Sequence, residues 1–534
     1  MQDPLLVRVD LHPDALLDPA ALRRAGATAA HLPEASVRSV EIVHRSIDAR
    51  RGKVRVHVEL ALRLDDKLEL HREQLPPALS SMSEEPAVVI VGAGPAGMFC
   101  AWGLARAGIR ALVLERGREV RARRHDLASL SQRGELVADS NYCFGEGGAG
   151  TFSDGKLYTR ASKRGPVRLV LEALRSYGAP ADILIDARPH IGTNRLPRVI
   201  TAMREHLASA GAEIRFDARV DALVTGPSGQ VRGVRLNGGE VVPAAAVVVA
   251  PGHSARDVQR WLQAAGVALS FKPFALGVRI EHPQALIDRL QFGGLAGHPA
   301  LGAASYRLVE QTPGGAVFSF CMCPGGFIVP AATDPGMQVV NGMSPSARHG
   351  HFANSGLVTE VGAAQLAEAG FDPSDALAGV AYQAALEAAA YAAGGGGFVA
   401  PAQGLADLVA GRLSKSLPAT SYHRGLESAR LDQLLGSLGP PLQHALRSLG
   451  ARMPGFLGPE AVAVGLESRT SCPVRIDRDP ETLVSPSTPG LYPSGEGAGF
   501  AGGIVSAALD GLRIAEAVVR QLGGRAEIVT AALG

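Results

Sequence analysis

The segment VVIVGAGPAGMFCAWGLARAGIRALVLERG, residues 88–117, constrains the fold of this chain more than any other. It opens with an unbroken apolar run at 88–91, which is typical of a strand buried on both faces of a parallel sheet. Small and apolar residues up to Gly108 then predict a helix, and residues 110–114 predict a second strand. This order is that of a βαβ unit, so the sequence predicts an α/β fold.

Three glycines in the spacing GxGxxG follow the first strand. Gly92 permits a tight turn, Gly94 lets the backbone approach a pyrophosphate, and Gly97 lets the helix pack against the sheet. Pro95 and Ala96 open the helix, whose N-terminus presents free N–H groups to an anion. A dinucleotide site is therefore favoured over a purely structural glycine turn.

Glu115 ends the second strand. Its carboxylate can accept hydrogen bonds from both hydroxyls of an adenosine ribose, and its charge repels a 2′-phosphate. The residue therefore indicates a dinucleotide without that phosphate.

The composition limits the classes to which this chain can belong. Its 534 residues suggest about two to four domains, and the formal net charge of +2 gives no bulk attraction to nucleic acid or anionic membranes. We see no apolar run long enough to span a membrane, no secretory signal and, with five scattered cysteines, no disulfide framework. We therefore expect a cytoplasmic protein without stable membrane insertion.

The pattern GAGPAG…ERG resembles that of the glutathione-reductase-type flavoproteins. The resemblance implies FAD as the cofactor, with Val220 against the adenine. It also implies a tight turn under the cofactor, here Ala250 and Gly252 around a proline where the usual turn is Ala-Thr-Gly. Arg116 and Arg123, which follow the acid, are expected to contact the cofactor as well.

Residues 141–159, NYCFGEGGAGTFSDGKLYT, contain too much glycine for a stable helix or strand. Such a loop exposes backbone N–H groups and lets a flat ligand approach, so we expect contacts to FAD from Gly148, Ala149, Gly150 and Thr151. A flexible linker is the alternative, but linkers rarely mix aromatic and charged residues among their glycines.

Residues 490–518 predict a strand, a glycine turn and an apolar helix. Gly502, Gly503 and Ile504 open that helix, and its N-terminus would stabilise the charge that the flavin gains at N1–C2=O on reduction. Gly495 and Glu496 form the turn, from which Glu496 is expected to hydrogen-bond the ribityl chain. A glycine-rich helix start in the core is the alternative.

Together these motifs resemble one family over nearly the whole chain: the bacterial and plastid FAD-dependent dehydrogenases of unassigned substrate with an extra N-terminal domain. Further marks of the resemblance are RSIDAR, FGEGGAGTFSDGKL, GHSARD, GVRIEHP, SFCMCPGG, NGMS and YPSGEGAGFAGGI. Broader features are shared with geranylgeranyl-reductase-type enzymes. The resemblance implies a glutathione-reductase-type FAD-binding Rossmann domain and leaves the substrate open.

The motifs also divide the chain into domains. The FAD-binding domain is expected to be discontinuous, formed by residues 84–270 and 455–534. An inserted α+β substrate domain is expected at 271–454 and a small N-terminal α+β domain at 1–80. Three polar residues lie where the chain is expected to cross between domains: Glu467, Arg469 and Thr470. An internal salt bridge and a contact with the substrate are equally open interpretations of these residues.

Residues 274–284, FALGVRIEHPQ, predict a strand that places Arg279 and Glu281 on one face. One interpretation is a surface pair. In the other, these side chains reach the open face of the flavin, where Arg279 binds an anionic group and His282 moves protons. Lys156 is a further candidate near the flavin.

Cys321 and Cys323 lie two residues apart in SFCMCPGG. On a regular strand they would share a face with Cα atoms about 6.6 Å apart, so a disulfide would be strained and easily reduced. A redox relay, a substrate-pocket lining and a plain core position all stay open. A metal site is not expected, because no second Cys/His pair has ligand spacing.

The N-terminal part carries a basic run, HRSIDARRGKVRVH, at residues 44–57. A solvated hairpin is one interpretation, and a docking surface for RNA or a protein partner is the other. The cations of this run are Arg45, Arg50, Arg51, Lys53 and Arg55.

The sequence therefore predicts a FAD-dependent oxidoreductase that transfers a hydride between flavin N5 and an unidentified small molecule. NAD(P)H stays open as a transient electron donor, since no second GxGxxG with a following acid is present. Two other functions stay open. One is a flavin-dependent RNA-modifying enzyme, and the other is an electron-transfer or redox-sensing flavoprotein that acts through a protein partner.

Overall fold

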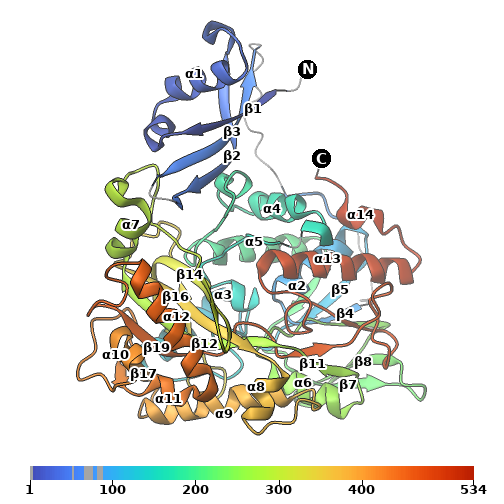
Figure 1. Cartoon of the computed structure of the whole chain (residues 1–534). Helices are drawn as coiled ribbons and strands as arrows, with labels where there is room; N and C mark the ends of the chain where they lie inside the picture. The colour runs from blue at the N-terminus through green and yellow to red at the C-terminus, as the bar shows by residue number, and fades with distance from the viewer. Residues whose placement is uncertain (1–3, 51–52, 65–75, 81–87, 161, 534) are drawn as a thin grey trace.

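A computed structural model describes residues 4–50, 53–64, 76–80, 88–160 and 162–533. Arg51 of the basic run lies outside these residues. The chain forms a large body with a smaller N-terminal domain projecting from it, coloured blue at the top of Figure 1.

The predicted parallel sheet is present. It has five strands in the order β21–β10–β4–β5–β6, and every neighbouring pair is parallel. The strands are β4 (Val88–Val91), β5 (Ala111–Leu114), β6 (Glu213–Arg215), β10 (Ala246–Val249) and β21 (Leu491–Pro493). Four of them are buried on both faces, as the unbroken apolar runs predict. The Rossmann-like domain expected from the sequence is therefore confirmed.

Helices and a small antiparallel sheet complete this domain. The glycines of α2 let α13 pack closely, since a Cβ on Gly103 would meet the Cβ of Ala515 at 2.9 Å. The helices are α2 (Pro95–Arg106), α3 (Val120–Arg133), α4 (Val167–Ser176), α5 (Leu196–Ser209), α6 (Arg256–Ala264), α13 (Ile504–Gln521) and α14 (Glu527–Thr530). The small sheet contains β7 (Val220–Thr225), β8 (Val231–Leu236) and β9 (Val241–Pro243).

The inserted part is built on an eight-stranded sheet, in the order β13–β14–β16–β12–β19–β17–β18 with β15 paired to β14. Its strands are β12 (Phe274–Pro283), β13 (Val309–Thr312), β14 (Gly315–Pro330), β15 (Val340–Met343), β16 (Phe352–Val361), β17 (Ala400–Gly404), β18 (Leu426–Ser428) and β19 (Val462–Glu467). Its helices are α7 (Gln284–Phe292), α8 (Ala363–Glu368), α9 (Ala378–Ala393), α10 (Leu405–Ala410), α11 (Leu431–Leu434) and α12 (Gly439–Arg452).

One expected boundary is placed too early. The second FAD-binding segment was expected to begin at 455, but β19 pairs with β12 in the sheet of the inserted part. The chain leaves that sheet later and forms β20 (Val474–Ile476), which pairs with β11 (Leu269–Phe271). The apolar run at 461–466 gave no sign of which sheet it would join, because pairing partners are set by tertiary contacts.

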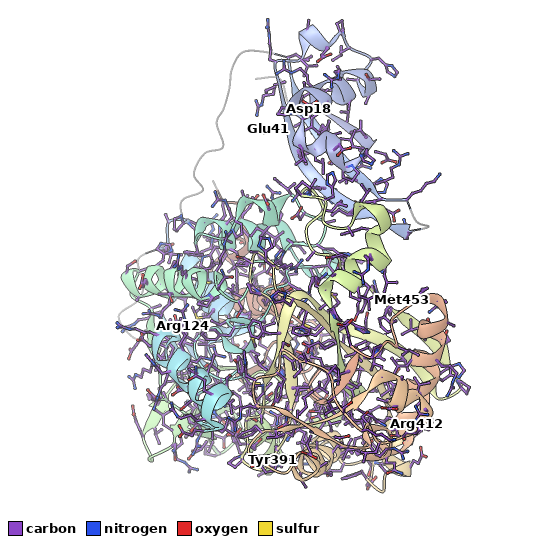
Figure 2. All side chains as sticks on the ribbon, turned by 90° about the vertical axis from the view of Figure 1, so that its left-hand side faces the viewer. Asp18, Glu41, Arg124, Tyr391, Arg412 and Met453 are labelled. Carbon is purple, nitrogen blue, oxygen red and sulfur yellow. The ribbon has the colours of Figure 1, made fainter. Side chains whose placement is uncertain are left out.

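The N-terminal domain is a three-stranded antiparallel sheet with one α-helix on it, as expected. Its elements are β1 (Leu5–Leu11), α1 (Pro19–Ala29), β2 (Ser39–Asp48) and β3 (Arg55–Arg63). Arg45 of β2 forms a bridge with Asp186 of the Rossmann-like domain, which ties the small domain to the body. Figure 2 shows it from the side, with Asp18 and Glu41 well above Arg124, Arg412 and Met453.

None of the helices formed by the described residues combines the length and the hydropathy needed to cross a bilayer.

Candidate cofactor and active site

The loops after β4, β5, β10 and β21 meet at the carboxyl edge of the parallel sheet, where ligands of such folds bind. The backbone N–H of Gly92 donates to the Leu114 carbonyl at 2.8 Å, and that of Ala250 to the Val91 carbonyl at 2.9 Å. The N–H of Ser494 donates to the Val249 carbonyl at 2.9 Å. Segments separated by up to four hundred residues of sequence therefore lie side by side.

Some of the glycines here are required by packing. A Cβ on Gly97 would lie 1.9 Å from the Gly92 carbonyl oxygen, and one on Gly92 would lie 2.3 Å from the Ala250 carbonyl oxygen. Gly495 approaches Ala96 in the same way, at 2.7 Å. These positions hold the loops against one another, which is the role expected of a glycine in a tight turn and at a helix–sheet contact.

Other glycines face open space. A Cβ on Gly94 would find only the Cα of Gly148, at 4.0 Å, and one on Gly502 or Gly503 would find nothing within 4 Å. The same is true of Gly252, whose φ of +76° also favours glycine. These positions lack side chains without being crowded, and we call the open backbone surface that they form the groove. That groove is a cradle suited to an extended dinucleotide.

The glycine-rich loop at 148–151 borders this groove. A Cβ on Gly148 would lie 3.0 Å from the Cα of Gly94, and one on Gly150 would lie 3.2 Å from Ile504 at the start of α13. Thr151 is fully buried, and its hydroxyl donates to the Glu146 carbonyl at 2.7 Å. The loop is thus ordered by its own contacts and is not a linker. The residues of the predicted cofactor site that this edge brings together are Gly92, Gly94, Pro95, Ala96, Gly97, Gly148, Ala149, Gly150, Thr151, Ala250, Gly252, Gly495, Glu496, Gly502, Gly503 and Ile504.

Glu115 connects three of these segments. Its carboxylate accepts the N–H of Ala93 at 2.8 Å and those of Gly117 and Gly145 at 2.9 Å. Two of these bonds fall on Oε1 and one on Oε2, so Oε2 keeps a free lone pair. A ribose hydroxyl can still donate to that oxygen, and the predicted ribose contact stays a prediction.

Arg123 lies behind the loop. It is fully buried and donates to the backbone carbonyls of Asn141, Tyr142, Glu146 and Gly148 at 2.8–3.1 Å. Burial lowers the pKa of its guanidinium to about 10. These bonds use four of its five N–H donors, so Arg123 positions the loop, and a direct contact with FAD stays a prediction.

Arg116 is also engaged. It pairs with Asp139 at 2.6 Å and with Asp257 at 2.8 Å, and its guanidinium lies 4.3 Å from the centre of the Phe144 ring. Val220 is buried in the same apolar cluster as Phe144, at the start of β7. Its expected contact with adenine stays a prediction.

Glu496 lies on the β21–α13 loop, with 22% of its side chain exposed. Burial raises the pKa of its carboxyl to about 7, and Lys272 opposes the shift. The charge of Cys321 is a smaller cause of the same upward shift in this pKa. Glu496 therefore changes its protonation state near neutral pH.

Beyond the groove, a polar cluster surrounds Lys156. Its Nζ lies 2.9 Å from Asp154 Oδ2, 3.5 Å from Cys323 Sγ and 3.8 Å from Cys321 Sγ. Arg348 also reaches Asp154 Oδ2, at 3.0 Å. The structure thus brings together three of the candidates chosen from the sequence. It adds Asp154 and Arg348, and the only local signal for these was the position of Asp154 two residues before Lys156.

The two cysteines do not lie on a regular strand, as had been assumed. β14 is interrupted by a bulge between Phe320 and Cys323, and Cys321 has a φ of +46°. Both thiols are free, and both face Lys156. A hydrogen bond from Cys323 and the charges of Lys156 and Arg279 hold the pKa of Cys321 well below the usual thiol value, and the pKa of Cys323 is raised. Cys321 is therefore the more acidic thiol of the pair.

Arg279 is fully buried, so the surface pair considered from the sequence is wrong. Its Nε donates to Glu467 at 2.6 Å, and Nη1 donates to Asn354 at 2.7 Å and to the Cys321 carbonyl at 3.3 Å. The guanidinium therefore supports the bulge that carries Cys321, and most of its donors are unavailable to an anion. Burial raises the pKa of Glu467 although Arg279 opposes the shift.

Glu281 and His282 do not join the Lys156 cluster. Glu281 accepts bonds from Thr420 Oγ1 at 2.7 Å and from the Ser421 N–H at 2.9 Å. His282 lies on the opposite face of β12, where its ring centre is 4.2 Å from that of Phe456 and its Nε2 donates to the Phe456 carbonyl. Burial lowers its pKa to about 4. Alternation along the strand directs His282 into the core, so its predicted proton transfer gains no support.

A second buried ion cluster joins the domains. Arg256 of α6 and Arg469 both pair with Glu387 of α9, at 2.8 Å and 2.9 Å. The internal salt bridge considered for Glu467 and Arg469 is therefore present at both residues. Thr470 donates to the Ala275 carbonyl at 2.6 Å. Sequence reasoning missed Arg256 and Glu387, which are 131 residues apart.

Comparison with known families gives three matches. Residues 273–470 match the family described as "FAD-dependent protein, C-terminal domain-like". Residues 90–135 match an NAD(P)-binding Rossmann-like domain, and residues 4–63 match a domain of unknown function.

An uncharacterized protein of Clostridium beijerinckii (strain ATCC 51743 / NCIMB 8052) is 39% identical over 511 residues, which cover 92% of this chain and 94% of that protein. Among solved structures, the flavin-dependent brominase Bmp2 is 15% identical with a TM-score of 0.37, over 82% of this chain and 80% of its own. The halogenase PltM is 13% identical with a TM-score of 0.39, over 83% and 72%. Scores this low carry no property over to this chain.

The relative matches almost from end to end, and the family model covers the part of the chain that contains Arg279, Cys321 and Cys323. The glycines described above leave the backbone at this edge accessible to an extended dinucleotide. The chain therefore belongs to this family of FAD-dependent proteins, and FAD is its cofactor.

Proposed function

We propose that the chain is an oxidoreductase whose small-molecule substrate binds beside Lys156 and Cys321. FAD, when bound, supplies hydride transfer at its N5 position. The observation that carries the proposal is that one loop contributes residues both to the groove and to the Lys156 cluster. Gly148 and Gly150 border the groove, and a few residues later Asp154 and Lys156 form the polar cluster.

The side chains of the cluster suit an anionic substrate. Lys156 keeps its positive charge, because the thiols and Asp154 raise its pKa. Arg348 adds a second cation, with Asp154 between them as a shared acceptor. Lys156 would bind and orient an anionic group. In its thiolate form, Cys321 Sγ would accept a proton from the substrate, and the thiol would return one.

An anaerobic screen tests this proposal. In one arm, the reduced holoprotein is mixed with small carboxylic acids and keto acids. In the other arm, the oxidised holoprotein is mixed with hydroxy acids, thiols, NADH or NADPH. The visible absorbance of the flavin is followed in both arms. We expect at least one compound to change the flavin's redox state, with a rate at least about tenfold lower in Lys156→Met, because a charge-assisted contact is lost. Equal rates in the wild type and Lys156→Met for every compound would contradict the proposal.

A second candidate is a redox flavoprotein that passes electrons to a protein partner through its thiols. It is favoured by the two free sulfurs that share one lysine. Here two electrons from the reduced flavin, together with two protons, would convert a Cys321–Cys323 disulfide into the dithiol, and the dithiol would then reduce a disulfide of the partner by thiol–disulfide exchange and return to the disulfide. If Cys321→Ser leaves flavin reoxidation and turnover unchanged, this candidate fails.

The RNA-modifying alternative draws little support from the basic run. Arg45 pairs with Asp186 at 2.7 Å and Arg50 with Asp48 at 2.7 Å, so two of its cations are already neutralised. Lys53 and Arg55 are exposed. A steep fall of RNA binding with added salt would be needed to revive this alternative. A reducing, cytoplasmic setting remains part of the proposal because the cysteines are free.

A further inference from the structure

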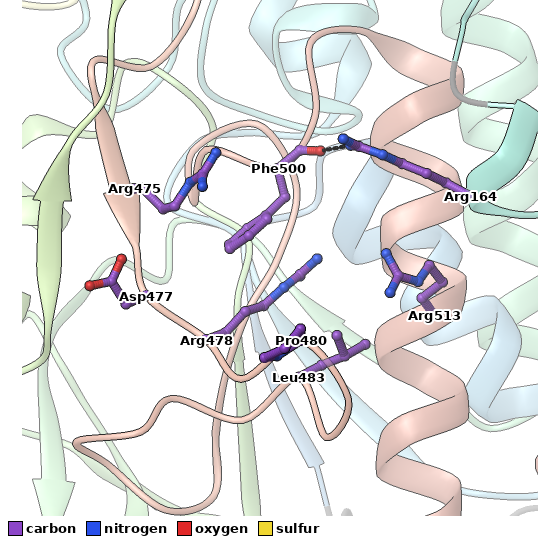
Figure 3. Close-up of a pocket in the computed structure, with 8 residues that line it drawn as sticks. All are labelled: Arg164, Arg475, Asp477, Arg478, Pro480, Leu483, Phe500 and Arg513. Atoms are coloured by element: carbon purple, nitrogen blue, oxygen red, sulfur yellow. Dashed lines mark hydrogen bonds between the residues drawn. The ribbon is translucent and has the colours of Figure 1, made fainter.

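A second pocket lies apart from the groove, on another face of α13. It has a volume of about 410 Å³ and is lined by Arg164, Arg475, Asp477, Arg478, Pro480, Leu483, Phe500 and Arg513. Gly511 of α13 packs on Ala96 of α2, whereas Arg513 extends from the same helix into the pocket, as Figure 3 shows. None of the residues that line this pocket belongs to the predicted cofactor site, although Phe500 lies on the loop between Glu496 and Gly502.

The pocket carries a large excess of positive charge. Arg478 is neutralised by Asp510, at 2.6 Å. Among the described residues, no carboxylate pairs with Arg164, Arg475 or Arg513.

The acid that lines the pocket offsets only part of this excess. The Ser270 hydroxyl donates to Asp477 at 2.8 Å, and in Figure 3 the carboxylate points away from the arginines. Three guanidiniums therefore line one cavity without a salt bridge among the described residues, and the charge of Asp477 offsets only one of them.

The arginines are held in place by Phe500. Arg478 lies 3.6 Å from the centre of the phenyl ring and Arg475 lies 5.4 Å from it, so the two flank the ring. Arg164 donates to the Phe500 carbonyl at 2.6 Å. Stacking and backbone contacts restrict long side chains that would otherwise be mobile. The cations are thus positioned to bind before any ligand arrives.

We propose that this pocket binds the phosphate or pyrophosphate group of an organic phosphate. Three unpaired guanidiniums call for a ligand with at least two negative charges, and the planar fork of arginine matches phosphate oxygens in bidentate geometry. The volume is within the usual range for small-ligand sites, and Pro480 and Leu483 give an apolar wall for the organic part. The proposal does not depend on the function proposed above.

The position of Phe500 gives the site a route to the flavin. Phe500 lies between Glu496 and Gly502 on the loop that lines the groove. A ligand that contacts its ring or competes for Arg164 would alter the packing of this loop. We therefore expect the visible spectrum of bound FAD to shift when the pocket is filled.

The test uses holoprotein saturated with FAD, so that the groove is closed to added nucleotide. Binding of pyrophosphate, ADP and succinate is measured by calorimetry at constant ionic strength, with the flavin spectrum as a second readout. We expect pyrophosphate and ADP to bind and succinate to bind at least about tenfold more weakly. Tighter binding of ADP than of pyrophosphate would identify an organic phosphate as the ligand, whereas equal affinity would limit the site to the free anion and contradict the organic part of the proposal.

Variants assign the binding to this pocket. Arg475→Ala and Arg513→Ala should each weaken ADP binding by about tenfold or more, and Arg513→Lys should restore part of it. Arg520→Ala is the matched control, since Arg520 is an exposed arginine on α13 outside the pocket. Absence of binding by both phosphate probes, or equal binding in Arg513→Ala and Arg520→Ala, would overturn the proposal. Thermal unfolding of each variant verifies that it is folded.

Discussion

The cofactor groove and the Lys156 cluster are joined by one loop, but the groove is formed by backbone and the cluster by side chains. The groove is lined by backbone, at positions such as Gly94 and Gly503 where a side chain is missing and space is left. The cluster is made of charged and nucleophilic side chains, and Arg279 and Glu467 support it from within the inserted sheet. A site made of backbone depends on local sequence, whereas a site made of side chains depends on contacts between distant segments.

The largest effect is expected from filling the groove. Gly94→Val should leave the chain folded but lower FAD affinity by more than about a thousandfold, because the side chain would enter the space for the pyrophosphate. Fluorescence titration with FAD measures the affinity, and circular dichroism reports the fold. Gly97→Ala is the contrasting variant, since its Cβ would meet the Gly92 carbonyl oxygen at 1.9 Å. It should unfold at a lower temperature. A yellow Gly94→Val protein with unchanged affinity would contradict this distinction.

The support of the cluster gives the next largest effect. Glu467→Gln leaves the buried Arg279 cation unpaired and should cost about 3–5 kcal/mol of unfolding free energy, measured by denaturant titration. Arg279→Met should cost less, because the carboxyl of Glu467 can take a proton, whereas a guanidinium cannot lose one. The surface pair of Arg50 and Asp48 is the control, and Asp48→Asn should lower the free energy of unfolding much less than either buried variant. A larger loss of unfolding free energy in Arg279→Met than in Glu467→Gln would show that the ion pair of Arg279 and Glu467 does not stabilise this region as described.

A smaller effect is expected within the cluster. Because the pKa of Cys321 is lowered, its alkylation by iodoacetamide should stay fast well below the usual thiol pKa. Lys156→Met removes a cation beside the sulfur, raises that pKa and should slow alkylation at about pH 7 by about tenfold. Mass spectrometry of the modified peptide measures the rate, with Cys321→Ser as the blank. An identical dependence of the alkylation rate on pH in Lys156→Met and in the wild type would show that Lys156 does not lower the pKa of Cys321.

The last effect is the pH dependence of stability, and it concerns Glu496 at the groove. Its folded pKa of about 7 lies above the unfolded value, so the unfolded chain loses its proton first as pH rises. Stability should therefore fall between about pH 4.5 and pH 7 and level off above. Glu496→Gln should abolish this fall. When the FAD-free variant is compared with the FAD-free wild type, their unfolding temperatures should therefore differ more at pH 8 than at pH 4. Parallel curves across this range would exclude the raised pKa.

The groove could be predicted from sequence because its elements are local. The run at 88–91, the spacing of Gly92, Gly94 and Gly97, and the glycine pair before α13 each determine a short piece of backbone. The structure places them together, as the resemblance implied.

The polar cluster could only be predicted in part. Lys156 and the two cysteines were identified as candidates, but Arg348 was not, because nothing in its neighbourhood marks it. His282 was misjudged for a different reason. The charged residues Arg279 and Glu281 lie close to it in sequence, yet alternation points its ring to the other face of the strand, toward Phe456. Side chains that are paired across more than a hundred residues, such as Arg279 with Glu467, leave no periodic signal in either segment.

The most direct test is a crystal structure of the chain with FAD. We predict one FAD per chain, with its pyrophosphate against Gly94 and Gly148 and its ring system between the start of α13 and the Lys156 cluster. FAD bound elsewhere, or a ring system far from both Gly503 and Cys321, would contradict the claim that these distant segments form one flavin site.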